Sequence, residues 1–67
     1  MKLGDNIRKK RLEYDIDQQE LAERIGITKG MLSRIERNLQ PPSVSVLICI
    51  ADVLHCSIDE LLGRKAS

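Results

Sequence analysis

The stretch that decides the fold is QQELAERIGITKGMLSRIER, residues 18–37. Apolar side chains recur at helical spacing on both sides of Gly26. Ala22 is small enough to let a second helix approach closely, and Gly26 tolerates the positive φ of a tight turn. The apolar residues that can fill the angle between two crossing helices are Leu21, Ile25, Ile27, Leu32 and Ile35. The stretch therefore predicts two short helices that cross steeply, with only a few residues between them.

Helix signals continue outward from this stretch on both sides. Residues that favour helix N-caps precede the last four apolar segments, and these residues are Asp17, Thr28, Ser43 and Ser57. Gly26, Asn38 and Gly63 stand where helices end, because they tolerate the left-handed conformation. We expect an all-α fold with helices at about residues 3–14, 17–25, 28–37, 43–54 and 57–62.

The chain is short and nearly neutral. Its 67 residues predict one domain over the range 1–67. Eleven basic and ten acidic residues give a formal net charge of +1, but basic residues cluster near both 2–11 and 29–37. Local clustering sets the field at a phosphate backbone, so the total charge does not exclude a nucleic-acid partner. No apolar run approaches the roughly 20 residues of a membrane span, and the charged start predicts no signal peptide. We therefore expect a cytoplasmic protein with no membrane partner.

Few groups are suited to catalysis or metal binding. Cys49 and Cys56 lie seven positions apart, and no second cysteine pair completes a zinc site. His55 is the single histidine, so no nucleophile, base and orienting group can be assembled. The sequence predicts reduced thiols, no metal, no cofactor, no small-molecule ligand and no enzymatic activity.

Four segments together resemble the phage-repressor-type helix-turn-helix family, also called xenobiotic-response-element-like or lambda-repressor-like. The segments are QQELA at 18–22, GIT at 26–28, SRIER at 33–37 and PS at 42–43, with Ala51 and Leu54 beyond them. The resemblance covers nearly the whole chain. It implies a compact five-helix domain whose third helix, at about 28–37, enters the DNA major groove. It also implies binding as a dimer to a palindromic operator.

The resemblance places base contacts on Lys29, Gly30 and Arg34, and Ser33 on the same face completes this predicted set. Arg34 can form a two-pronged contact with O6 and N7 of guanine, although a solvated helix charge is the alternative. Lys29 can reach the same acceptors, with phosphate contact as its alternative. Gly30 departs from the usual polar side chain, and either close backbone approach or local flexibility would explain it.

A second predicted set contacts phosphates, which positions the domain without reading sequence. Gln18 matches a phosphate-contacting glutamine of the family, although it can also cap its helix. Arg37 and Asn38 match backbone-contacting positions, and Thr28 completes the set. By the same resemblance, Arg11 and Glu36 are expected to form an internal ion pair between the first and third helices, rather than to contact DNA.

The segment 43–54 carries more apolar residues than one core face needs. The pattern assigns to the core Val44, Leu47, Ile48, Ile50, Ala51 and Leu54. Val46, Cys49 and Val53 form a further stripe at helical spacing, and such a stripe suggests a partner surface. The predicted dimer interface comprises Val46, Cys49, Val53, Ile58, Leu61 and Leu62. The alternative is a fourth helix that is buried all round.

Two functions follow from these features. The first is a sequence-specific, double-stranded-DNA-binding transcriptional regulator, a repressor that acts as a homodimer. The second is an antitoxin-like or coregulator module, which uses the same fold to hold another protein. The cationic face of the segment 28–37 favours DNA, and the apolar stripe of the segment 43–54 favours a partner protein.

Overall fold

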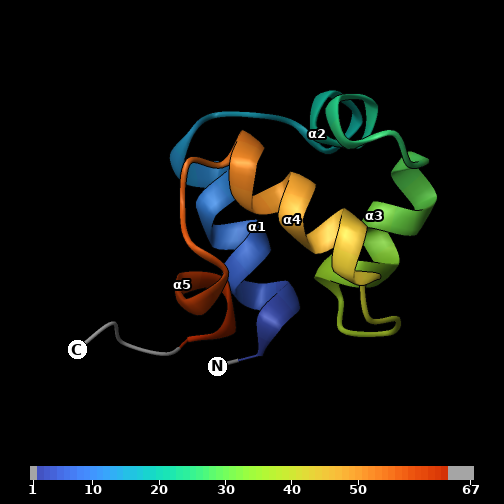
Figure 1. The fold of residues 1–67 in the computed structure, drawn as a ribbon. Coiled ribbons are helices and arrows are strands. Elements are labelled where there is room, and N and C mark those ends of the chain that lie inside the picture. Colours follow the sequence, from blue (N-terminus) through green and yellow to red (C-terminus); the bar gives the residue numbers. More distant parts are fainter. Residues whose placement is uncertain (1, 64–67) are drawn as a thin grey trace.

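The computed structural model describes residues 2–63, which form five helices and no strand (Figure 1). The helices are α1 (Leu3–Glu13), α2 (Gln18–Ile25), α3 (Lys29–Glu36), α4 (Val44–Val53) and α5 (Ile58–Leu62). The all-α, five-helix prediction is confirmed, with helix bounds within about two residues of those expected. None of the helices in residues 2–63 is both long and apolar enough to cross a bilayer.

Side chains cap the N-termini of four helices. Asp17, Thr28, Ser43 and Ser57 each accept a hydrogen bond from the backbone N–H three residues later. Each cap satisfies one of the amides that a helix leaves free at its start. Lys2, which precedes α1, makes no such bond.

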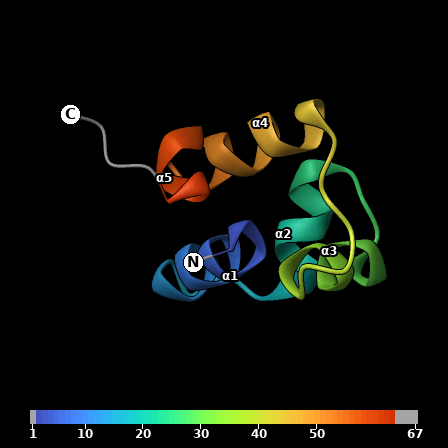
Figure 2. The same cartoon turned by 90° about the horizontal axis from the view of Figure 1, so that it is seen from below.

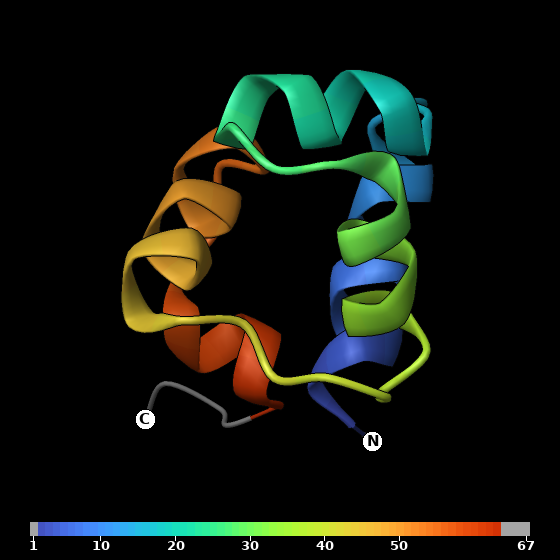
Figure 3. The ribbon, with the colours of Figure 1, turned by 90° about the vertical axis from the view of Figure 1, so that its right-hand side faces the viewer.

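The helices surround one aliphatic core. α2 contacts both α3 and α4, while α1 contacts α3 and α5. Figure 3 shows α2 crossing one end of the molecule, with α1 and α3 on one side and α4 and α5 on the other. In Figure 2, α4 lies across the molecule from α1, so one long face of α4 is turned outward. The fully buried large side chains come from all five helices and their ends: Ile7, Leu21, Leu32, Ile35, Ile50, Leu54 and Leu61.

The rotation of α4 differs from the one that the sequence pattern predicts. Val44 is 75% exposed and Ile48 is 46% exposed, so their assignment to the core was wrong. Val46 and Val53, predicted as a surplus stripe, instead pack against the core. Because α4 is apolar on nearly every side, residue spacing does not fix its rotation. Its contacts with α2 and α5 decide which side is buried.

The predicted dimer surface needs a further correction at α5. Leu61 has no exposed area and belongs to the core, so it cannot contact a second copy of this fold. Ile58 is partly buried against the same core. Of the predicted interface residues, Cys49 and Leu62 are exposed.

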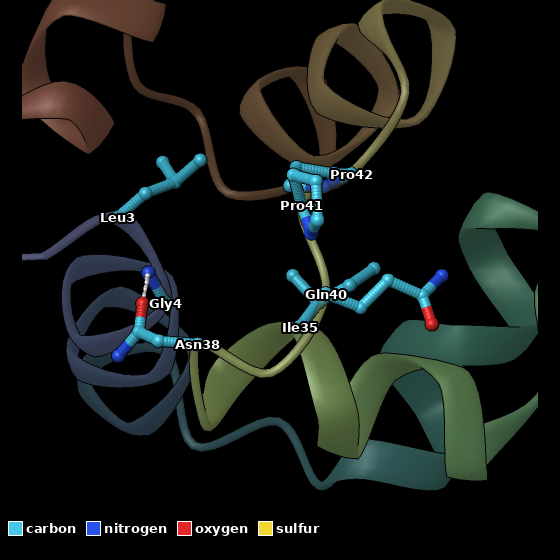
Figure 4. A pocket seen from close by; sticks show the side chains of 7 residues that line it. All are labelled: Leu3, Gly4, Ile35, Asn38, Gln40, Pro41 and Pro42. Carbon is cyan, nitrogen blue, oxygen red and sulfur yellow. Dashed lines mark hydrogen bonds between the residues drawn. The ribbon is translucent and has the colours of Figure 1, made fainter.

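α1 and α3 approach each other closely at Gly4. A Cβ atom built on Gly4 would overlap the carbonyl oxygen of Ile35, and it would lie 2.7 Å from the carbonyl oxygen of Glu36. The Gly4 N–H donates to Oδ1 of Asn38 at 2.9 Å (Figure 4). Asn38 has a φ of 62°, as expected for the residue that ends the third helix, and its side chain thereby secures the start of α1.

Candidate nucleic-acid interface

The turn between α2 and α3 is built as the sequence predicts. Gly26 adopts the left-handed conformation, with φ 77° and ψ 29°, at the end of α2. The N–H of Ile27 then donates to the carbonyl of Ala22 at 3.0 Å, which closes the helix end. Thr28 Oγ1 accepts from the N–H of Met31 at 3.1 Å and starts α3 after a turn of only a few residues. This turn holds α3 across α2 with one face outward (Figure 3).

The outward face of α3 carries every residue that the sequence predicts as a base contact. Successive residues rotate by about 100° around a helix, which places these residues within one continuous arc. Lys29, Gly30 and Arg34 are exposed, and Ser33 is partly exposed. Arg37, just beyond the helix, is exposed on the same arc. The structure thus places three cations and a hydroxyl group on one face.

The inward side of α3 carries a buried carboxylate that joins three helices. Glu36, 3% exposed, accepts from Nε and Nη2 of Arg11 at 2.8 and 3.0 Å. It also accepts from Nε2 of Gln18 at 3.1 Å. The remaining terminal nitrogen of Arg11, Nη1, donates to the carbonyl of Ile16 at 2.8 Å. The expected ion pair between α1 and α3 is therefore present, and it also fixes the start of α2.

Two residues of the predicted phosphate set keep free donors. The amide group of Gln18 has two N–H donors, and Glu36 engages one of them. The hydroxyl oxygen of Thr28 accepts the capping bond, which leaves its own proton free to donate. Asn38 is more fully occupied, because its Nδ2 donates to Oδ1 of Asp5 at 3.2 Å while its Oδ1 holds Gly4.

A cation that the sequence reasoning did not assign joins this surface. Arg8 lines a shallow hollow with Gln18 and Lys29, and it lines a second hollow with Gln18 and Arg37. Arg8 therefore lies between the two ends of the cationic face of α3. Residue spacing within α1 does not relate Arg8 to Lys29 or to Arg37, so the sequence offers no signal for this position.

A second residue outside the prediction contacts Arg34 directly. Nε of Arg34 donates to Oε1 of Gln40 at 3.2 Å. Gln40 lies in the connection between α3 and α4 and has no helical spacing that would relate it to Arg34. Sequence periodicity offers no signal for this contact.

The shifted pKa values lie away from this face, near the end of α1 and the start of α5. Glu13 raises the pKa of Lys10 above 10.5, and Glu60 adds to this effect. Burial raises the pKa of the Cys56 thiol above 9.0, with a further contribution from Glu60. Within residues 2–63, no three His, Cys, Asp or Glu side chains are grouped so that they could hold a metal ion.

Most of the chain, including the residues of this surface from Arg8 to Gln40, matches a known family. A family model described as helix-turn-helix matches residues 7–61. The chain belongs to this family. The regulator SinR of Bacillus licheniformis, described as an HTH-type transcriptional regulator, is 42% identical over 64 residues, which are 94% of this chain and 58% of SinR. The cryptic phage CTXphi transcriptional repressor RstR of Vibrio cholerae is 34% identical over 67 residues, which are 100% of this chain and 60% of RstR. The chain of this helix-turn-helix protein thus spans less than two thirds of the length of either relative.

Solved structures show the same fold. The P22 c2 repressor in complex with a synthetic operator superposes with a TM-score of 0.90 at 29% identity, over 97% of this chain and 98% of that chain. SinR in complex with DNA superposes with a TM-score of 0.83 at 43% identity, over 90% and 97% of the two chains. The resemblance to phage-repressor-type helix-turn-helix proteins is therefore confirmed.

Proposed function

We propose that this helix-turn-helix domain binds double-stranded DNA in a sequence-specific manner and acts in a transcriptional repressor. The observation that carries the proposal is the outward face of α3, a helix that is held across α2. This face carries Lys29 and Arg34, and Arg37 follows on the same arc just beyond the helix. A helix of this size fits the major groove, and its N-terminal half meets base edges in this class of motif. The DNA complexes of the P22 c2 repressor and SinR support the proposal, because both proteins share this fold.

The proposed base contacts are Lys29, Gly30, Ser33 and Arg34. Arg34 offers paired N–H donors to guanine, and Lys29 offers a mobile positive charge to the same acceptors. The hydroxyl group of Ser33 can donate to or accept from a base edge. Gly30 contributes a backbone without a side chain.

The proposed phosphate contacts are Gln18, Thr28, Arg37 and Asn38, with Arg8 added from the structure. Arg8 and Arg37 carry full charges, so they should dominate the dependence on salt. Gln18 and Thr28 add neutral hydrogen-bond donors whose positions are fixed by the carboxylate of Glu36 and by the cap of α3. Asn38 contributes least, because α1 already engages both ends of its side chain.

We also propose that two copies bind a palindromic operator, with half-sites about one helical turn of DNA apart. The exposed apolar side chains Val44 and Ile48 on α4, together with Leu62 at the end of α5, support a contact between the copies. Ile48→Lys should shift the sedimentation profile of the DNA complex towards one bound copy. Leu12→Lys, at an apolar position on α1 that is 55% exposed and lies outside this surface, serves as the matched control. An unchanged profile for Ile48→Lys would remove this surface from the proposal.

The experiment that tests DNA binding is selection from a random duplex pool, followed by binding measurements at several salt concentrations. The logarithm of the affinity should fall linearly with the logarithm of salt concentration, with a slope of about −0.9 for each neutralised phosphate. Arg34→Ala should weaken the preference at one base pair by about 1–3 kcal/mol. Arg37→Ala should weaken binding to all sequences alike. Affinity that is independent of both salt and sequence would contradict the proposal.

A second function, a protein-interaction module, has one observation in its favour. Val44 is 75% exposed on a helix that is apolar on nearly every side. A complex of SinR with the SinI protein has been solved, and its SinR chain is 43% identical to this chain over the shared fold. Loss of repression in cells by Val44→Lys, with the DNA affinity of this domain unchanged, would favour this alternative.

A further inference from the structure

The guanidinium group of Arg34 is held against the outward face of α3. Its Nε donates to Oε1 of Gln40 at 3.2 Å. Its Nη1 lies 3.9 Å from the position that a Cβ atom on Gly30 would occupy. The side chain therefore runs back along α3 towards the preceding turn, as long side chains on helices commonly do.

Gln40 lies in a constrained segment of the chain. It is partly buried, and Pro41 and Pro42 follow it directly. Each proline fixes its own φ, and Pro41 also restricts the backbone of Gln40. The N–H of Leu39 donates to the carbonyl of Arg34 at 2.9 Å, which ties the preceding residue to α3. Figure 4 shows the amide group of Gln40 extending away from Gly4 and from Leu3.

The contact with Gln40 leaves the two terminal nitrogens of the guanidinium group, Nη1 and Nη2, free to donate to a base edge. A guanidinium group has five N–H donors, and Gln40 accepts from the single one on Nε. The four donors on Nη1 and Nη2 remain available within residues 2–63, where no other side-chain hydrogen bond or ion pair engages Arg34. Guanine O6 and N7 need two donors with this parallel geometry.

Gly30 leaves open the space that the guanidinium group approaches. Its φ is not positive, so the backbone conformation does not require glycine at this position. Apart from the adjacent residues and the backbone of α3 itself, Nη1 of Arg34 is the one heavy atom of residues 2–63 within 4 Å of the missing Cβ. A long side chain at residue 30 would stand where the guanidinium group of Arg34 now lies.

We propose that Gln40 is a positioning residue for base recognition, and that it holds Arg34 over the space left by Gly30. Sequence preference is then concentrated on Arg34, whose Nη1 and Nη2 face the base pair. The proposal rests on the proposed DNA-binding function. It assigns a role in specificity to Gln40, which lies outside α3.

The first test compares Gln40→Met with Gln40→Glu. Methionine keeps the length of the side chain but lacks a strong acceptor, whereas glutamate keeps an oxygen that can accept from Nε of Arg34. The readout is the ratio of affinities for the selected duplex and for a duplex changed at the base pair that Arg34→Ala identifies. Gln40→Met should lower this ratio about threefold to tenfold, the loss expected for one hydrogen bond. Gln40→Glu should retain the ratio, although its charge weakens binding to both duplexes.

A double-mutant cycle separates positioning from direct contact. Arg34→Lys removes the Nε donor, so Gln40→Met should cause no further loss of preference in the Arg34→Lys background. A loss that persists in that background would show that Gln40 reads DNA itself, and this would overturn the proposal. Gly30→Leu should reduce the preference in the original background, because a long side chain at residue 30 would occupy the space that the guanidinium group of Arg34 approaches.

A measurement without DNA tests the positioning separately. Hydrogen exchange of the Arg34 Nε–H, followed by nuclear magnetic resonance, should be faster in Gln40→Met than in the original chain and in Gln40→Glu. Equal exchange rates in all three proteins would overturn the proposed positioning even if DNA binding is sequence-specific. An original chain without any sequence preference would instead overturn the proposed function, and with it the role in recognition.

Discussion

Replacing Glu36 with alanine should destabilise the domain more than any comparable change to an exposed carboxylate. Glu36 is 3% exposed and accepts three hydrogen bonds, two from Arg11 and one from Gln18. Without it, the guanidinium group of Arg11, in a residue that is 7% exposed, keeps only the bond to the carbonyl of Ile16. A positive charge would thus stay buried with most of its donors unmatched.

The expected loss is large relative to the stability of the whole domain. Removing one member of a buried ion pair costs about 3–5 kcal/mol. A 67-residue domain has a total free energy of unfolding of about 3–10 kcal/mol, at about 0.05–0.15 kcal/mol for each residue. We therefore expect Glu36→Ala to be marginally folded or unfolded at 25 °C. Replacing both partners, in Arg11→Met with Glu36→Leu, should recover most of the loss because no charge remains buried.

Urea unfolding followed by circular dichroism at the helix band measures these free energies. This signal suits a chain with one tyrosine and no tryptophan. Glu20→Ala is the matched control, since Glu20 and Arg24 form an ion pair at 2.6 Å with side chains that are 46% and 52% exposed. The control should lose less than about 1 kcal/mol. Glu36→Gln, which keeps one acceptor oxygen, extends the series if Glu36→Ala does not fold.

Two results would refute this reasoning. One is a Glu36→Ala variant that unfolds within about 1 kcal/mol of the Glu20→Ala control. The other is a double variant of Arg11 and Glu36 whose loss equals the sum of the two single losses, because independent residues behave in that way. Either result would mean that the buried pair does not hold α1 against α3.

Four further predictions concern glycines and thiols. Gly4→Ala should lower the free energy of unfolding by about 1–3 kcal/mol, because the added carbon overlaps the backbone of α3; an unchanged urea midpoint would contradict the close approach. Gly30→Ala should raise it by up to about 1 kcal/mol, because alanine favours the helix and only an ordinary contact results; a lower midpoint would contradict this account. At neutral pH the exposed Cys49 should be alkylated faster than Cys56, because Cys56 is partly buried and its thiol pKa is raised. Mass spectrometry of the two peptides measures both rates, and faster alkylation of Cys56 would contradict its burial. Because the pKa of Cys56 is higher in the folded chain than its ordinary value of 9.0, its contribution to stability should be complete below pH 9.0 and be lost as the pH rises through the folded value. Urea melts of the original chain and of Cys56→Ala at several pH values would measure this difference.

The fold was predictable because its decisive signals are local. Asp17 and Thr28 mark helix starts within three residues of the amides that they cap, and Gly26 marks the turn between α2 and α3. The base-contact candidates could be placed on one face for the same reason, since the period of the helix relates Lys29 to Ser33 and Arg34. Whether these side chains contact bases stays a prediction.

The errors arose where neighbouring elements, rather than the local sequence, decide the outcome. Ile48 and Val53 are both apolar, and only the positions of α2 and α5 determine that Val53 is partly buried while Ile48 is exposed. Gln40 was missed because a loop residue has no period that relates it to Arg34. Arg8 was missed because its relation to Lys29 and to the end of α3 depends on how α1 packs.

The long-range cap of α1 has a consequence for how the domain forms. The other four helices carry the signals for their own starts, whereas the amide of Gly4 depends on Asn38, a residue 34 positions further along the chain. We expect the start of α1 to become ordered only when the end of α3 is already in place. Protection of the Gly4 amide during refolding would therefore report the moment at which distant parts of the chain first meet.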